Sequence, residues 1–352
     1  MYNILVINPG STSTKIAVFH DEKMIFQQNL RHSGDELKPF PMIASQYEFR
    51  QEAVLNCLAD HNIPLDFDII VGRGGILKPL NSGVYAITEI MKAELLSAKY
   101  GEHASNLGGL IASNIADSIG CKAVIADPVV VDELQDVARI SGHPLFPRIS
   151  IFHALNQKAT ARIYAAEKQS KYEDLNLIVA HLGGGISVGA HCKGKVIDTN
   201  NAVDYGPFSP ERSGTISLVG LTKLCFSGKY TLDQVQKMLN GEGGLMAHLG
   251  TNEAHVAVER AKNGDKKAQL VIEALAYNVA KEIGSMATVL QGKVDAILLT
   301  GGIAYNTYIT DHISKMVQFI APISIYPGED ELWALASNGI HALKTQFIFD
   351  YE

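Results

Sequence analysis

Residues 4–19 read Ile-Leu-Val-Ile-Asn-Pro-Gly-Ser-Thr-Ser-Thr-Lys-Ile-Ala-Val-Phe, and the rest of the chain is organised around them. Two short apolar runs flank Pro9, Gly10 and a series of hydroxyl residues, which predicts a β-hairpin with a polar turn. Gly10 lets the backbone approach a ligand, the hydroxyl residues offer donors, and Lys15 adds a positive charge. Such a turn can hold a phosphate, although an ordinary solvated turn has the same composition.

A chain of 352 residues exceeds the usual size of one hydrophobic core, so two domains are expected. Its 47% hydrophobic and 19% charged residues are typical of a globular protein with a large core. The net charge of −7 argues against nucleic acid or an anionic membrane as the main partner.

No apolar run approaches the ~18 residues that a membrane span requires, and the start of the chain lacks the pattern of a secretion signal. The cysteines are far apart and lack the paired spacing of a zinc site or a disulfide scaffold, so buried free thiols are expected. Both observations predict a cytoplasmic protein.

The hydrophobic pattern predicts an α/β fold, because strands alternate with helices. In the first part of the chain we expect a third strand at residues 24–30, helices within 35–60 interrupted near 39–41, a strand at 68–71, a helix at 105–119 and a strand at 123–126. Further on we expect a helix at 154–168, a helical region at 217–264, a helix at 265–290, strands at 295–300 and 323–326, and a last helix from Leu332.

The chain contains an internal repeat in the order of its predicted elements. Residues 177–191 form a second apolar strand, glycine-rich turn and apolar strand, followed by a third strand at 195–198. We therefore predict two α/β domains with the same core, at residues 1–150 and 151–352. They would join through packed structure near Ser150, and the last helix would be free to pack back on the first domain.

Three glycine-bearing turns follow predicted strands, at residues 9–10, 183–185 and 301–302. Glycines at strand ends let backbone N–H groups reach phosphate oxygens, so three such turns suggest a polyphosphate held between two domains. Residues 189–195 imitate a P-loop, but Val196 stands where a magnesium-binding hydroxyl is needed. The predicted context is also a hairpin, which excludes that motif.

Residues 7–15 (INPGSTSTK), 181–185 (HLGGG) and 300–303 (TGGI) together resemble the two phosphate loops and the adenosine loop of the acetate and sugar kinase, Hsp70 and actin superfamily. Over nearly its whole length the chain is similar to the butyrate kinase branch of the acetate kinase family. The resemblance implies a two-domain actin-like ATPase (ribonuclease H-like) fold, with a duplicated core of mixed sheets flanked by helices and an inter-domain cleft. Residues 101–108, 152–154 and 209–214 support it.

The resemblance implies reversible in-line phosphoryl transfer between ATP and a short-chain carboxylate, butanoate or a branched analogue, giving an acyl phosphate and ADP with Mg²⁺. It also implies a homodimer or a larger homo-oligomer. The residues that it assigns to phosphate and adenosine binding are Asn8, Ser11, Ser13 and Lys15 in the first loop, His181, Gly183, Gly184 and Gly185 in the second, and Gly301, Gly302 and Ile303 in the third.

A carboxylate acceptor is already an anion at neutral pH, because its pKa is ~4, so the site needs no general base. It must instead overcome repulsion between two anions, which arginines and histidines can do. By resemblance, Arg73 and Arg212 bind the phosphoryl group, and Arg73 also binds the substrate. His153 donates to the phosphoryl group in the transition state, and His103 lines the substrate side.

Each arginine also has a simpler interpretation. Arg73, between two glycines after a strand, could be a solvated surface residue. Arg212 could pair with the adjacent Glu211. For His153 and His103 the simpler interpretation is a surface or a satisfied core histidine.

Two carboxylates are assigned to the metal by the resemblance. Asp127 would position Mg²⁺ as a catalytic residue, although its place before Pro128 equally suggests a helix N-cap. Glu331 would lie beside the metal, but the neighbouring Glu329 and Asp330 leave the register open.

The chain departs from acetate kinases where Gly184 replaces their usual asparagine and where residues 73–76 replace a longer polar segment. These differences indicate a larger acyl pocket, with Ile76, Val84 and Phe208 as candidate lining. Two other functions are compatible with the superfamily. A sugar or anhydrosugar kinase would need a base carboxylate facing the acceptor hydroxyl, and an actin- or Hsp70-type ATPase would hydrolyse ATP without an acceptor.

Overall fold

The computed structural model describes all 352 residues, which divide into two compact units. Unit 1 comprises residues 1–131 and 330–352, and unit 2 comprises residues 132–329. The sequence placed the division near residue 150. In the structure the backbone N–H of Gln135 donates to the Ile197 carbonyl (3.0 Å), and Arg148 pairs with Asp198 (2.7 Å). These bonds attach residues 132–150 to an edge strand of unit 2.

Unit 1 is a six-stranded mixed sheet in the order β3-β2-β1-β4-β6-β5. β1, β2 and β3 are antiparallel, β4 and β6 continue parallel to β1, and β5 is antiparallel to β6. The strands are β1 (Asn3–Gly10), β2 (Ser13–His20), β3 (Lys23–Arg31), β4 (Ile69–Arg73), β5 (Val84–Ala86) and β6 (Lys122–Ala126). The helices are α1 (Gly34–Leu37), η1 (Ile43–Gln46), α2 (Tyr47–Asp60), α3 (Glu89–Leu96), α4 (Asn106–Ile119) and α13 (Glu331–Thr345).

Unit 2 has a five-stranded sheet in the order β11-β10-β7-β8-β9. Its strands are β7 (Asn176–Leu182), β8 (Ile186–Cys192), β9 (Lys195–Thr199), β10 (Ala296–Gly301) and β11 (Ile323–Pro327). Its helices are α5 (Asp136–Arg139), α6 (Ala154–Glu167), η2 (Tyr172–Asp174), α7 (Leu218–Cys225), α8 (Leu232–Leu239), α9 (Gly244–Leu249), α10 (Ala254–Lys262), α11 (Lys266–Val289), η3 (Gly302–Tyr305) and α12 (Thr307–Val317).

The predicted duplication is confirmed by the strand order. In each unit an antiparallel three-stranded meander is followed by two strands that add parallel to its first strand: β3-β2-β1-β4-β6 in unit 1 and β9-β8-β7-β10-β11 in unit 2. Only unit 1 adds an edge strand, β5. The sequence analysis missed β5 and α3 in unit 1 and α5 and α12 in unit 2.

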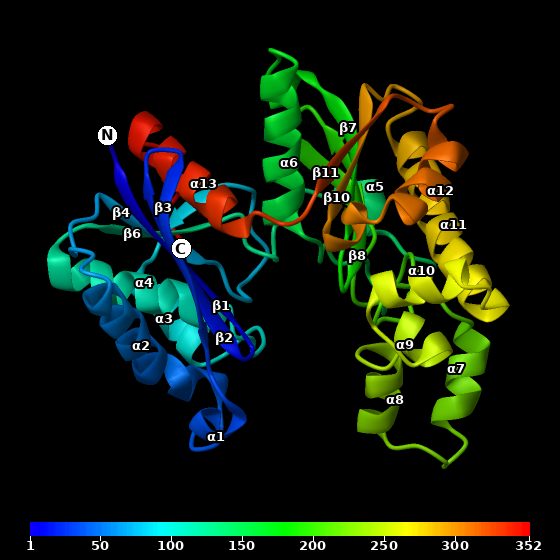
Figure 1. The fold of residues 1–352 in the computed structure, drawn as a ribbon, viewed down its shortest axis with the longest axis horizontal. Coiled ribbons are helices and arrows are strands. Elements are labelled where there is room, and N and C mark those ends of the chain that lie inside the picture. Colours follow the sequence, from blue (N-terminus) through cyan, green and yellow to red (C-terminus); the bar gives the residue numbers. More distant parts are fainter. The chain divides into compact units, whose positions relative to one another are not determined.

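Both faces of each sheet are covered, which explains the unbroken apolar runs of the central strands. In unit 1, Leu5 and Ile7 of β1 belong to the core formed with α2 and α4. The opposite face of β1 and β4 packs on α13, drawn in red in Figure 1. In unit 2, Ile178 and Ala180 of β7 face the core of α11 and α12, whereas Leu177 and Val179 face α6.

The polar turn in the opening hairpin is shorter than the sequence suggested. Pairing of β1 with β2 continues to Gly10 opposite Ser13, so only two residues form the turn. Thr14 is buried and Lys15 is exposed, as the alternation of a strand requires. The cysteines are free as expected, but only Cys57 is buried. None of the helices is both long and apolar enough to span a membrane.

The contact between α4 and β4 depends on two glycines. A Cβ on Gly108 would lie 2.4 Å from the carbonyl oxygen of Arg73, and a Cβ on Gly72 would lie 2.3 Å from that of Gly108. The helix can therefore reach the strand only because both positions lack a side chain. The same contact sets the position of Arg73 at the end of β4.

We expect Gly108→Ala to lower the free energy of unfolding by about 1–3 kcal/mol, because the added methyl must push α4 off the strand. Gly284→Ala, in α11, is the matched control. A Cβ at position 284 would meet nothing within 4 Å, so this change should be neutral or should stabilise by about 0.5–1 kcal/mol. Chemical denaturation of both variants measures the difference, and equal stabilities would contradict the packing argument.

Candidate functional site

Three predicted site residues of unit 1 meet beside the carboxyl ends of two central strands of its sheet. Parallel pairing places Ile7 of β1 opposite Gly72 of β4, so Asn8 and Arg73 both follow the last paired residues of neighbouring strands. Nη1 of Arg73 donates to Oε2 of Glu331 (2.7 Å) and to Oδ1 of Asn8 (3.2 Å). Nδ2 of Asn8 donates to the same Glu331 oxygen (2.7 Å). Residues 8, 73 and 331 thus form one polar cluster.

The three acidic candidates at the start of α13, Glu329, Asp330 and Glu331, make different contacts. Oδ1 of Asp330 accepts the backbone N–H of Trp333 (2.9 Å), so Asp330 caps the helix. Glu331 instead turns its carboxylate to Arg73 and Asn8, whereas Glu329 belongs to unit 2. Of these three acidic residues, Glu331 is the one whose carboxylate lies in the cluster.

Half of the Arg73 guanidinium has no protein partner. Its two hydrogen bonds both come from Nη1, so Nε and Nη2 remain without an acceptor, and the side chain is 26% exposed. A solvated surface arginine would not be held by an asparagine and a glutamate at a strand end. The guanidinium of Arg73 can therefore bind an anion.

Asp127 directly follows β6, has a positive φ of 39° and is 2% exposed. Its Oδ1 accepts the hydroxyl of Ser82 (2.6 Å) and the backbone N–H of Gly83 (2.9 Å). No helix begins at Pro128, so the alternative N-cap interpretation is not what the structure shows. The carboxylate holds the loop before β5.

His103 lies in the loop before α4. Its Nδ1 contacts the hydroxyl of Ser105 (2.8 Å) and accepts the Ser105 backbone N–H (3.2 Å). Burial of the ring, and then the nearby positive charge of Arg73, lower the pKa of His103. The ring is therefore mainly neutral at pH 7.

Sequence reasoning missed the residue that shapes the first predicted phosphate loop. Arg50 of α2 is fully buried, and its Nη atoms donate to the carbonyls of Gly10 (2.7 Å), Ser11 (2.8 Å) and Ser13 (3.0 Å). Its fork also reaches Oε1 of Gln46, and burial lowers its pKa. A signal was present, because Arg50 shares a helical face with buried Val54, Cys57 and Leu58.

The remaining predicted residues of this loop do not join the cluster. Ser11 and Lys15 are exposed and Ser13 is half-buried. Thr14, which was not among the predicted phosphate-binding residues, is fully buried, and its hydroxyl is hydrogen-bonded to Nε2 of His32 (2.9 Å). The loop therefore offers backbone and hydroxyl donors above a buried cation.

In unit 2, His153 and His181 stack on each other, with ring centroids 3.8 Å apart and planes at 14°. Nδ1 of His153 lies 2.8 Å from the hydroxyl of Ser187. His181 contacts Oδ1 of Asn156 through Nδ1 (2.8 Å) and Glu329 through Nε2 (3.2 Å). The pair lies beside the glycine turn at residues 183–185.

Arg212 passes directly over Gly185. A Cβ on that glycine would lie 2.2 Å from Nη1 of Arg212. Nη1 donates to the carbonyl of Ala202 (2.8 Å) and Nε to Oδ1 of Asn240 (3.1 Å), while Nη2 has no protein partner. Glu211 bonds Asn252 instead (2.6 Å), so the alternative Glu211–Arg212 salt bridge is absent. Burial lowers the pKa of Arg212.

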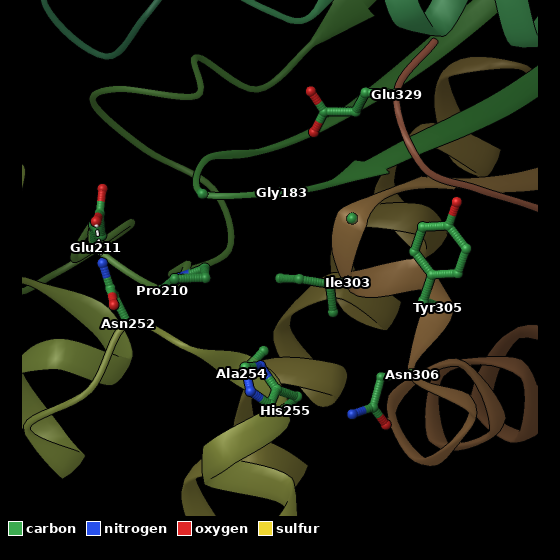
Figure 2. Close-up of a pocket in the computed structure, with 12 residues that line it drawn as sticks. Gly183, Pro210, Glu211, Asn252, Ala254, His255, Ile303, Tyr305, Asn306 and Glu329 are labelled. Atoms are coloured by element: carbon green, nitrogen blue, oxygen red, sulfur yellow. Dashed lines mark hydrogen bonds between the residues drawn. The ribbon is translucent and has the colours of Figure 1, made fainter. Parts of the chain in front are cut away.

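A cavity of about 440 Å³ in unit 2 joins the second and third glycine turns (Figure 2). They meet because parallel β7 and β10 end together, with His181 opposite Thr300. Of the predicted residues, Gly183, Gly184, Gly302 and Ile303 line it. The sequence analysis missed the rest of the lining: Pro210, Glu211, Asn252, Ala254, His255, Tyr305, Asn306 and Glu329. Several of these lie in helices or loops that carry no glycine signature.

Comparison with known proteins gives a consistent result. The chain is 56% identical to butyrate kinase 2 of Clostridium acetobutylicum, over 98% of both chains. It is 54% identical to a probable butyrate kinase of Bacteroides thetaiotaomicron, over 97% of both. The Acetokinase family profile matches residues 151–323.

The crystal structure of Porphyromonas gingivalis acetate kinase has the same fold. It superimposes with a TM-score of 0.81 at 18% identity, covering 97% of this chain and 100% of that one. This likeness confirms the two-domain actin-like ATPase fold that the resemblance implied. With sequence identities above 50% to two butyrate kinases over nearly the full length, the chain belongs to the acetokinase family.

Proposed function

We propose that the protein is a short-chain carboxylate kinase that reversibly transfers the γ-phosphoryl group of ATP to butanoate or a branched analogue. The geometric observation that carries this proposal is the pair of unsatisfied guanidinium forks on Arg73 and Arg212. Each is held at a strand end or a glycine turn with N–H groups still available. The 56% identity to a protein named butyrate kinase 2 supports the same acceptor.

The proposed reaction depends on neutralising the negative charges of the carboxylate and the phosphates, and not on proton transfer. The acceptor carboxylate is ionised at pH 7, so no base has to remove a proton. Repulsion between this carboxylate and the phosphates is the main obstacle, and planar arginine forks suit the equatorial phosphoryl oxygens. In this proposal Arg73 binds both the carboxylate and the phosphoryl group, with His103 on the substrate side. Arg212 and His153 bind the same phosphoryl group.

For ATP we propose the cavity of unit 2. Its glycine turns at residues 183–185 and 301–302 present backbone N–H groups for phosphates. Ile303 and the exposed ring of Tyr305 offer apolar surface for an adenine. Asn306 and His255 add polar groups. Asn8, Ser11, Ser13 and Lys15 supply the second set of phosphate contacts from unit 1.

The residues present fit a Mg²⁺ ion carried by the nucleotide. No group of three or more His, Cys, Asp or Glu side chains is placed to hold a metal. Mg²⁺ characteristically uses one or two carboxylates together with substrate phosphates and water. Asp127 and Glu331 would supply these carboxylates. A bound ion would neutralise charge on the nucleotide phosphates.

The first test traps the product. Incubation with ATP, Mg²⁺, hydroxylamine and a panel of C2 to C5 acids should give an acyl hydroxamate, with C4 acids giving the highest rate. Butan-1-ol is the matched control, because it has the same chain length and no carboxylate. ADP release that no acid stimulates would indicate an actin- or Hsp70-type ATPase. Phosphorylation of a sugar hydroxyl would indicate a sugar kinase.

Replacing Arg73 tests its proposed role. We expect Arg73→Ala to lower kcat with butanoate by at least ~100-fold while the fold persists, because charge on the transferring group loses its partner. Arg139→Ala is a control that removes another partly exposed arginine, whose partner is Asp132. Circular dichroism checks folding. Near-normal turnover of Arg73→Ala would remove this residue from the mechanism.

Replacing Arg50 should affect both stability and ATP binding, because its side chain holds the loop at residues 10–13. Arg50→Met leaves the carbonyls of residues 10, 11 and 13 without their buried donor, so we expect a loss of about 3 kcal/mol or more in unfolding free energy. The KM for ATP should rise about tenfold, because the loop loses its shape and an underlying positive charge. Arg50→Lys keeps the charge without the fork and should recover part of the loss. An unchanged KM for ATP in both variants would contradict this role.

A further inference from the structure

A chain of hydrogen bonds runs from His153 into the core of unit 2. Nδ1 of His153 contacts Oγ of Ser187 (2.8 Å), which also accepts Nε2 of Gln157 (2.8 Å). Oε1 of Gln157 contacts Nε2 of His191 (2.9 Å), and Nδ1 of His191 contacts the hydroxyl of Tyr172 (2.7 Å). Ser187, Gln157 and His191 are fully buried, so water cannot readily replace a link.

The direction of each bond follows from donor and acceptor chemistry. Nε2 of Gln157 lies 3.1 Å from the backbone carbonyl of Ser187, which can only accept, so this end of the amide must be the NH₂ group. Oε1 therefore faces His191 and can only accept. Nε2 of His191 must carry a hydrogen.

His191 is neutral, because burial and then the positive charges of Lys158 and Arg162 lower its pKa well below the usual value. A neutral ring has one N–H, and it is already assigned to Nε2. Nδ1 therefore accepts the hydroxyl hydrogen of Tyr172. The far end of the chain thus has one orientation.

The same reasoning orients Ser187. Its Oγ accepts Nε2–H of Gln157 and, at 3.3 Å, the backbone N–H of His153. Both lone pairs are used, so the single hydroxyl hydrogen points to Nδ1 of His153. Nδ1 accepts, and the hydrogen of the His153 ring lies on Nε2.

We propose that Ser187 and Gln157 are positioning residues that hold His153 as a neutral, Nε2-protonated hydrogen-bond donor to the transferring phosphoryl group. This inference rests on the role of His153 in the proposed function. An imidazolium would direct Nδ1–H at an oxygen whose lone pairs are occupied. The reaction needs only a hydrogen-bond donor at this position, because carboxylate and ATP become acyl phosphate and ADP without a proton transfer at this histidine.

The backbone of β8 gives independent support. A Cβ on Gly189 would lie 2.5 Å from Oε1 of Gln157 and 3.1 Å from Nε2 of His191. The strand therefore lacks a side chain at the point where the hydrogen bond between these two residues passes. The rings of His153 and His181 stack with centroids 3.8 Å apart, so positive charge on both would be repulsive.

The decisive measurement is the tautomer of His153 in the wild-type protein. Long-range ¹H–¹⁵N correlation spectra of protein labelled at histidine show which ring nitrogen carries the hydrogen, and the signals missing in His153→Ala assign the residue. We expect the Nε2–H tautomer at pH 7 and above. A neutral Nδ1–H form, or an imidazolium at pH 7, would overturn the proposal.

Turnover of His153→Ala separates this inference from the proposed function. A loss of kcat together with an Nδ1–H tautomer would refute only the positioning role. Full activity of His153→Ala together with an Nε2–H tautomer would refute the role of His153 in the reaction and with it the purpose of the positioning. We expect the loss of kcat and the Nε2–H tautomer.

Variants provide the functional readout. Ser187→Ala removes the hydroxyl that donates to Nδ1, so kcat should fall about tenfold while the KM for ATP changes less than about twofold. His153 should then show a mixture of tautomers. Ser113→Ala, which removes a buried hydroxyl from unit 1, is the matched control and should keep wild-type kinetics. An unchanged kcat and tautomer in Ser187→Ala would contradict the proposal.

Discussion

The parallel pairing of the first and fourth strands of each unit is the constraint on which the rest of the structure depends. In unit 1 it joins β1 to β4, and in unit 2 it joins β7 to β10. Burial of both faces favours this pairing, because central strands of Val, Ile and Leu need helices on each side. As a consequence, segments that are distant in sequence lie together at the carboxyl ends of neighbouring strands. Asn8 therefore meets Arg73, and the turn after His181 meets the one after Thr300.

The arginine side chains of the candidate site donate mainly to uncharged acceptors. Arg50 binds carbonyls and an amide, and Arg212 binds a carbonyl and an amide. Arg73 has one carboxylate partner, Glu331, on one nitrogen. Neutral acceptors orient a guanidinium without cancelling its charge, so its field stays available to an anionic ligand. The cost is desolvation, which appears as the lowered pKa values of Arg50 and Arg212.

Much of the fold could be predicted from the sequence, because its patterns are local. Alternation and apolar runs predicted the hairpins, and the repeat of strand, glycine turn and strand predicted the duplicated core. Other elements were missed, namely β5, α3, α5 and α12. The length of the opening turn was also overestimated, because hydroxyl residues continue in the paired strands. Polarity alone does not mark where a strand ends.

The sequence by itself determined the fold class, the glycine turns and the identity of the cationic and acidic candidates, since each depends on residue type and local spacing. Only the tertiary structure decided which of them meet. It placed Glu331 and not Asp330 beside Arg73, freed Arg212 from Glu211, buried Arg50 beneath the opening hairpin and connected His153 to Gln157 through Ser187. These outcomes depend on sheet register and helix packing, which bring together groups that no local pattern relates.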